Sequence, residues 1–127
     1  MENSKMILEI KGGVGYITFN NPEKHNAVSL EMWESLGDMM YQLEKDNKIR
    51  VVVLKGAGGK SFVSGADISK FDKDRSTKEQ VLNYNAKTGK LYQRIESFPK
   101  PTIAMIDGYC IGGGLNLAVC CDIRICS

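Results

Sequence analysis

Two apolar runs constrain the fold of this chain more than any other feature. Residues 51–56 read VVVLKG and residues 102–107 read TIAMID. Continuous apolar runs of this length are typical of strands that are covered on both faces, as in parallel sheets. The segments around them have helical periodicity, so strands alternate with helices. This order predicts an α/β domain with parallel strands.

The first fifty residues predict a hairpin followed by a helix. The runs MILEI and VGYITFN flank Lys11, Gly12 and Gly13, which is typical of two antiparallel strands. Ser29 is a suitable N-cap for a helix that we expect to reach about Asn47. Apolar residues recur there at steps of three and four, namely Leu30, Trp33, Leu36, Met40 and Leu43.

A second helix is predicted over about residues 77–97. Two overlapping capping boxes open it, Ser76 with Glu79 and Thr77 with Gln80, and Pro99 cannot continue it. The side chains that we expect this helix to bury are Val81, Leu82, Tyr84, Ala86, Leu91 and Ile95. Before it, AGGKS predicts a turn between two strands.

Three consecutive glycines stand near the end of the sequence, in GYCIGGGLNLAVCCDIRICS. We expect a turn over 108–114, a short helix over 115–121 and a strand in DIRIC. Free N–H groups at a helix start bind negative charge or a polarised carbonyl oxygen. Residues 64–68, SGADI, form a second glycine turn. If both turns face one cleft they can form an oxyanion hole, and otherwise they are tight turns only.

Composition excludes several other classes of protein. The 127 residues suffice for one domain, and a net charge of +2 gives no reason to expect nucleic acid or a membrane surface as a partner. No segment is apolar over the length of a membrane span, and no signal peptide is recognisable. The four cysteines, which form no recognisable disulfide or metal pattern, favour a reducing compartment, so we expect a cytoplasmic protein.

Cysteine and histidine do not form a recognisable metal or catalytic pattern. The four cysteines, Cys110, Cys120, Cys121 and Cys126, include no Cys-x-x-Cys pair and are predicted to be small buried hydrophobes. The only histidine, His25, lies far from them in sequence and is predicted to be a surface residue, since no base–nucleophile pair is evident. No metal site is expected.

Nucleotide-binding motifs are incomplete in this sequence. Gly59-Lys60-Ser61 matches the end of a phosphate loop, but position 54 is Leu where the motif needs glycine. The glycine triplet likewise fails the dinucleotide fingerprint at its last position. A phosphate-loop site and a dinucleotide-binding site are therefore both disfavoured.

Taken together, three stretches resemble the enoyl-CoA hydratase/isomerase (crotonase) superfamily. They are YITFNNPEKHNAVS, VVVLKGAGGKSFVSGADISKF and FPKPTIAMIDGYCIGGGLNLAVCCDIRICS, in that order. The resemblance implies an α/β spiral of repeated ββα units, with residues 1–127 as its N-terminal part, truncated before a C-terminal helical region. It also implies an acyl-CoA substrate, with coenzyme A as part of the substrate and no separate cofactor.

The resemblance also implies a site. An oxyanion hole would use the backbone N–H groups of Ala66 and Gly113, and coenzyme A would be held by residues around the first glycine turn and the preceding loop. Those residues are Lys24, His25, Ala27, Ser64, Gly65, Ala66, Asp67 and Ile68. Family hydratases carry a glutamate where this sequence has Asn116, and an amide can orient a water or a carbonyl but cannot act as a general base.

The family's second acid–base position and the region that builds trimers or hexamers lie beyond residue 127. We therefore expect this chain to be part of a longer homo-oligomeric enzyme, and on its own either to self-associate or to need the missing part. The function hypotheses are an acyl-CoA lyase or isomerase of fatty acid metabolism, an acyl-CoA hydrolase of the same fold, or a non-catalytic acyl-CoA-binding fragment.

Overall fold

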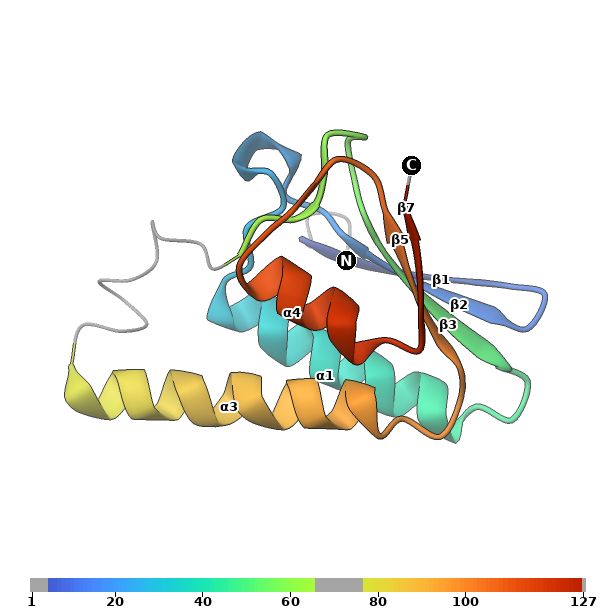
Figure 1. Cartoon of the computed structure of the whole chain (residues 1–127). Helices are drawn as coiled ribbons and strands as arrows, with labels where there is room; N and C mark the ends of the chain where they lie inside the picture. Colours follow the sequence, from blue (N-terminus) through green and yellow to red (C-terminus); the bar gives the residue numbers. More distant parts are fainter. Residues whose placement is uncertain (1–4, 66–76, 127) are drawn as a thin grey trace.

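A computed structural model describes residues 5–65 and 77–126 as an α/β layered domain (Figure 1). The elements in chain order are β1 (Met6–Lys11), β2 (Val14–Phe19), the 3-10 helix η1 (Pro22–Lys24), α1 (Leu30–Lys45), β3 (Val51–Gly56), β4 (Ser61–Val63), α3 (Lys78–Glu96), β5 (Thr102–Ile106), β6 (Tyr109–Cys110), α4 (Gly113–Cys120) and β7 (Ile123–Cys126). The predicted alternation of strands and helices is confirmed.

The large sheet has five strands in the order β1-β2-β3-β5-β7, and β4 and β6 form a separate two-stranded sheet. Strands β1 and β2 are the predicted antiparallel hairpin. The other pairs are parallel, with Val53 opposite Tyr16 on one side and Ile103 on the other. The opening hairpin and the parallel strands were therefore both predicted correctly.

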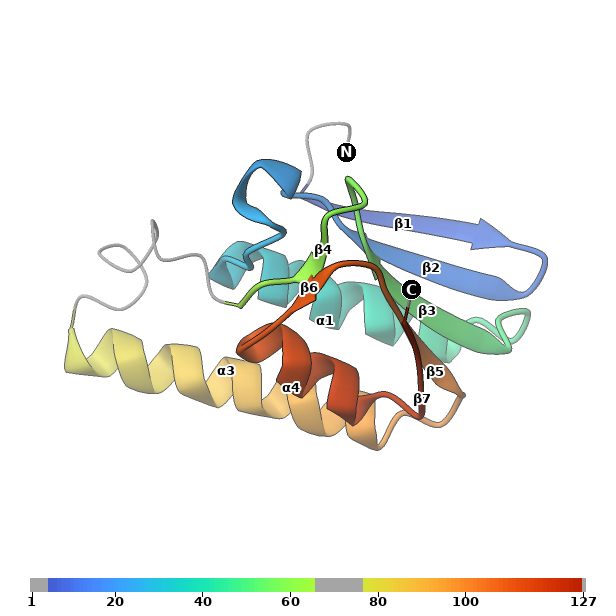
Figure 2. The same cartoon turned by 45° about the horizontal axis from the view of Figure 1, so that its top comes forward.

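The helices cover one face of the large sheet only, within the described residues. Figures 1 and 2 show α1, α3 and α4 on the same side. Leu54 and Ala104 are fully buried beneath them, whereas Met105 on the opposite face is 44% exposed. The expectation that TIAMID is buried on both faces is therefore wrong for the described part of the chain, because no helix covers the far side of β5.

Helix α1 follows its local signals closely. The Ser29 hydroxyl accepts a hydrogen bond from the Met32 N–H at 3.3 Å, and the helix ends at Lys45, two residues before the expected end. All of the expected apolar positions are buried except Leu30, which is half-buried, and Met32 is buried in addition. This face of α1 supplies a large part of the core.

Helix α3 uses the second of the two predicted capping boxes, Thr77 with Gln80. Ser76 lies outside the described residues. The expected burial is wrong at Leu82, which is 61% exposed, and at Ala86, which is exposed. Thr88, which was not expected in the core, is buried. Its hydroxyl donates to the Tyr84 carbonyl oxygen at 3.1 Å, and this hydrogen bond replaces the one that water would otherwise supply.

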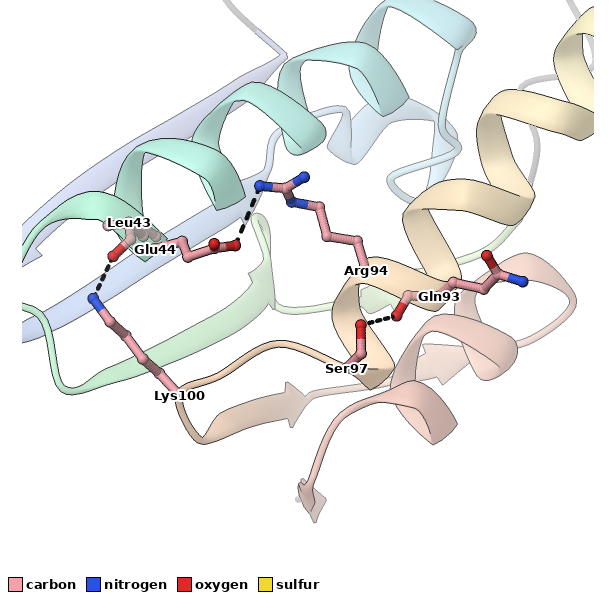
Figure 3. A network of polar contacts seen from close by, with 6 residues as sticks. All are labelled: Leu43, Glu44, Gln93, Arg94, Ser97 and Lys100. Carbon is pink, nitrogen blue, oxygen red and sulfur yellow. Dashed lines mark hydrogen bonds and ion pairs between the residues drawn. The ribbon is translucent and has the colours of Figure 1, made fainter.

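Polar contacts join the end of α3 to the end of α1 (Figure 3). The Arg94 guanidinium pairs with the Glu44 carboxylate at 3.3 Å. After α3 the chain turns back, and the Lys100 ammonium donates to the carbonyl oxygens of Leu43 at 2.6 Å and Asp46 at 2.7 Å. Lys100 thereby satisfies carbonyl groups that the end of α1 leaves without helical partners.

Candidate functional site

The two glycine turns meet at the carboxyl ends of β4 and β6. These strands are parallel, with Ser61 opposite Tyr109 and Val63 opposite Cys110, so the segments that leave them start side by side. A Cβ built on Gly65 would lie 3.7 Å from the Gly113 nitrogen. The convergence that the sequence alone left open is therefore present in the fold.

The triplet itself differs from the prediction, because the helix begins at Gly113 rather than at residue 115. Gly112 is the N-cap with φ 55°, a conformation that favours glycine. Tyr109 and Cys110, expected in a turn, form the short strand β6. Gly114 packs so tightly that a Cβ there would overlap the Val63 carbonyl oxygen. Tertiary packing thus places the helix start two residues early.

The first turn of α4 presents Gly113 as a donor. The Gly114 N–H donates to the Ile111 carbonyl at 2.9 Å, and the Asn116 N–H donates to the Gly112 carbonyl at 3.1 Å. Within residues 5–65 and 77–126, the Gly113 N–H has no hydrogen-bond acceptor. A donor of this kind at a helix N-terminus suits an oxygen that carries partial negative charge.

The loop after β2 lies against the first glycine turn. The Ser64 hydroxyl donates to the Lys24 carbonyl at 3.3 Å, and the Val28 N–H donates to the Gly65 carbonyl at 2.8 Å. Ala27 is buried between these contacts, and its N–H donates to the Lys24 carbonyl. Five of the predicted coenzyme A residues, Lys24, His25, Ala27, Ser64 and Gly65, are therefore gathered in two adjoining loops. Ala66, Asp67 and Ile68 lie outside the described residues.

His25 is exposed, as predicted. It has a left-handed backbone with φ 54°, and its ring packs edge-on against Tyr109 with 5.5 Å between the ring centroids. This contact joins the loop after β2 to β6. His25 is thus an exposed residue at the edge of the candidate site.

Asn26 was missed by sequence reasoning, although it holds the loop in place. Its side chain is fully buried and donates to the carbonyl oxygens of Ala57 and Ser61, both at 3.0 Å, while its oxygen accepts from the Asn21 N–H at 2.8 Å. Its φ of 59° is one that asparagine tolerates better than most residues. An asparagine in a polar loop was the only available signal, and it is a weak one.

Tyr92 is a second residue that the sequence did not single out. Its hydroxyl donates to the Gly113 carbonyl at 3.4 Å, and the Asn116 side chain hydrogen-bonds to the same hydroxyl. Burial raises the pKa of Tyr92, and the Asn116 hydrogen bond offsets part of that rise. Tyr92 and Asn116 therefore form a neutral pair beside Gly113 at physiological pH.

The cysteines are all free thiols. Cys121 is buried as predicted, and burial raises its pKa to about 11. Cys110 and Cys120 are half-buried. Cys126 is exposed, so the expectation of burial is wrong for this residue, because its strand β7 lies at the edge of the sheet. The described residues hold no group of three or more side chains suited to a metal ion. Nor does any described helix combine the length and apolarity needed to cross a membrane.

Comparison with known proteins supports the resemblance. The model of the enoyl-CoA hydratase/isomerase family matches residues 9–127, which is most of the sequence. The chain belongs to this family. The predicted family membership is therefore confirmed.

Family members with similar sequences include a short-chain-enoyl-CoA hydratase from Clostridium acetobutylicum, 39% identical over all of this chain and 48% of the relative. A crotonyl-CoA hydratase from Syntrophomonas wolfei is 34% identical over 98% of this chain and 47% of the relative. A mitochondrial Delta(3,5)-Delta(2,4)-dienoyl-CoA isomerase from Mus musculus is 36% identical, covering 88% and 37% respectively. The chain thus spans about half the length of the hydratases it matches.

Solved structures of the family agree with the fold. An enoyl-CoA hydratase/carnithine racemase from Magnetospirillum magneticum superposes with a TM-score of 0.91 at 41% identity, over 97% of this chain and 46% of that one. A family protein from Hyphomonas neptunium gives 0.92 at 29% identity, over 98% and 47%. The predicted crotonase-like α/β fold is therefore confirmed.

Proposed function

We propose that this chain binds the thioester of an acyl-CoA and stabilises its enolate with two backbone donors, the N–H groups of Gly113 and Ala66. One observation carries the proposal, namely the approach of Gly65 to the Gly113 nitrogen. Ala66 follows Gly65 directly in the sequence, and the family resemblance assigns the second donor to its N–H. Two fixed donors at one point suit the oxygen of a polarised thioester.

Coenzyme A would lie along the two loops that adjoin this point. These loops carry Lys24, His25, Ala27, Ser64 and Gly65. One backbone hydrogen bond and one hydrogen bond from the Ser64 hydroxyl hold them together. The proposal extends to Ala66, Asp67 and Ile68 by the family resemblance. Coenzyme A arrives as part of the substrate, so the proposed chemistry uses no separate cofactor.

For the whole protein we propose enoyl-CoA hydratase or isomerase chemistry, in line with the names of its relatives. Asn116 cannot be the general base of such a reaction, since an amide does not accept a proton at neutral pH. We assign it to orienting a water or a carbonyl oxygen. This residue also favours the alternative of an acyl-CoA-binding protein without turnover.

Acetoacetyl-CoA tests the donors directly, because the enolate of a 3-oxoacyl thioester absorbs in the near ultraviolet. We expect the wild-type chain to increase this absorbance at neutral pH. Gly113→Pro removes the N–H at the first position of α4, where proline is tolerated. The enolisation constant of the bound ligand should fall by about 100- to 1000-fold.

Gly113→Ala is the matched control, because it adds a Cβ but keeps the N–H. That Cβ would lie 3.2 Å from the Tyr92 hydroxyl oxygen, which a small rotation relieves. Equal enolate absorbance in the wild type and the proline variant would contradict the oxyanion assignment. Turnover assays with crotonyl-CoA and a 3-enoyl-CoA, on this chain and on a full-length version, decide between enzyme and binder. Enolate stabilisation without turnover in the full-length version indicates the binding alternative.

A further inference from the structure

Tyr92 lies beside Gly113 although it comes from another helix. A Cβ on Gly113 would lie 3.2 Å from the Tyr92 hydroxyl oxygen and 3.7 Å from the Gly65 Cα. Gly65 and Tyr92 therefore both border the candidate donor. The described candidate coenzyme A residues belong to the loops around Gly65. Tyr92 is the other neighbour of a Cβ on Gly113, so we place the acyl group beside Tyr92.

The ring of Tyr92 is held in place from behind. It packs edge-on against the Trp33 ring, with 5.4 Å between the centroids. Trp33 is itself only 2% exposed, and its indole N–H donates to the Tyr84 hydroxyl at 3.2 Å. Because close-packed cores resist displacement, the Tyr92 ring cannot move inward to admit a ligand.

The Tyr92 hydroxyl is also held by the first turn of α4. It contacts the Gly113 carbonyl at 3.4 Å, and the Asn116 side chain is close enough to lower its pKa. These contacts tie the far end of the ring to the element that carries the donor. The ring is thus fixed at both ends next to the point where a thioester oxygen would bind.

We propose that Tyr92 is a specificity-determining residue, whose ring limits the length of acyl group that can bind with its thioester oxygen on the Gly113 N–H. The inference rests on the proposed function and adds the substrate class, namely short-chain acyl-CoA thioesters. Replacing the ring by a small side chain should open the space beside Gly113 to longer chains.

A series of saturated acyl-CoA thioesters of increasing chain length tests this proposal. Acetyl-, butyryl-, hexanoyl- and octanoyl-CoA would be titrated by calorimetry into the full chain, its Tyr92→Ala and Tyr92→Leu variants, and two controls. Each methylene newly buried should tighten Kd about fourfold. The ratio of octanoyl-CoA to acetyl-CoA affinity should therefore rise at least tenfold in Tyr92→Ala, and less in Tyr92→Leu.

Two matched variants complete the design. Tyr92→Phe keeps the ring and removes only its hydroxyl contact with Gly113, so the ratio of octanoyl-CoA to acetyl-CoA affinity should rise less than in Tyr92→Leu. Tyr41→Ala removes a tyrosine that is 54% exposed on α1 and should change nothing. If Tyr92→Ala fails to fold by circular dichroism, Tyr92→Leu carries the test, because it keeps apolar contact with Trp33.

The possible outcomes separate the two proposals. If Tyr92→Ala and Tyr92→Leu still bind acetyl-CoA and keep the wild-type ratio of octanoyl-CoA to acetyl-CoA affinity, the role of Tyr92 is overturned. The proposed function is then left intact. Absence of binding of any acyl-CoA to the wild-type chain overturns the proposed function, and the role of Tyr92 with it. A shift toward longer chains in the variants supports both.

Discussion

Three adjacent glycines near the end of the chain have three different structural roles. Gly112 supplies a positive φ, Gly113 supplies a donor at the start of α4, and Gly114 allows the helix to touch the end of β4. The sequence shows only that side chains are absent at these positions. Which neighbour each glycine meets is decided by strands that lie far away in sequence.

Gly114→Ala should destabilise the chain by about 2–3 kcal/mol, since overpacking against a backbone carbonyl forces α4 away from Val63. Gly89→Ala is the control, because a Cβ there meets nothing within 4 Å. In the interior of α3 it should stabilise by about 0.5–1 kcal/mol. Urea unfolding would measure both changes, and equal midpoints for the two variants would contradict the packing argument.

At the scale of elements, local signals predicted the long helices closely, and predicted the short helix with a start two residues too late. Ser29 and Thr77 cap α1 and α3 as expected, because a capping hydrogen bond spans only three residues. Helix α4 begins with two glycines, which are poor helix formers. Burial of Leu117 and Ala118 against the core stabilises it instead.

The end of α1 depends on a residue more than fifty positions away. Lys100→Met should destabilise the chain by about 1–2 kcal/mol, because the Leu43 carbonyl (Figure 3) and the Asp46 carbonyl both lose a charged donor. Lys87→Met removes an exposed 3.6 Å ion pair with Glu34 and should cost less than about 0.5 kcal/mol. Thermal unfolding compares them, and a smaller loss for Lys100→Met than for Lys87→Met would refute the capping role.

Considered as a whole molecule, the domain has one helix-covered face and one open face within its described residues. On the open side, Met105 of β5 and the register partner Ile125 of β7 are both exposed. β7 is also an edge strand, with all four of its residues exposed. Exposed apolar edge strands are templates for pairing with another chain.

We therefore expect the isolated chain to self-associate through β7. Sedimentation should show species heavier than the 14.1 kDa monomer, in amounts that rise with concentration. Ile125→Lys should weaken this association at least tenfold, because an edge lysine opposes strand pairing. Leu82→Lys changes a leucine of similar exposure on α3 and should leave it unaltered. A wild-type chain that stays monomeric at all concentrations would disprove the expectation.

The sequence by itself determined the hairpin, the caps of α1 and α3, the parallel strands and the family, because each depends on short patterns or on motifs in a given order. Only the tertiary structure decided that Gly65 meets Gly113, that α4 begins at the triplet, and that Asn26 and Tyr92 border the site. These features depend on contacts between residues 20 to 50 positions apart, which appear only when β4 and β6 are paired and α3 packs against α4.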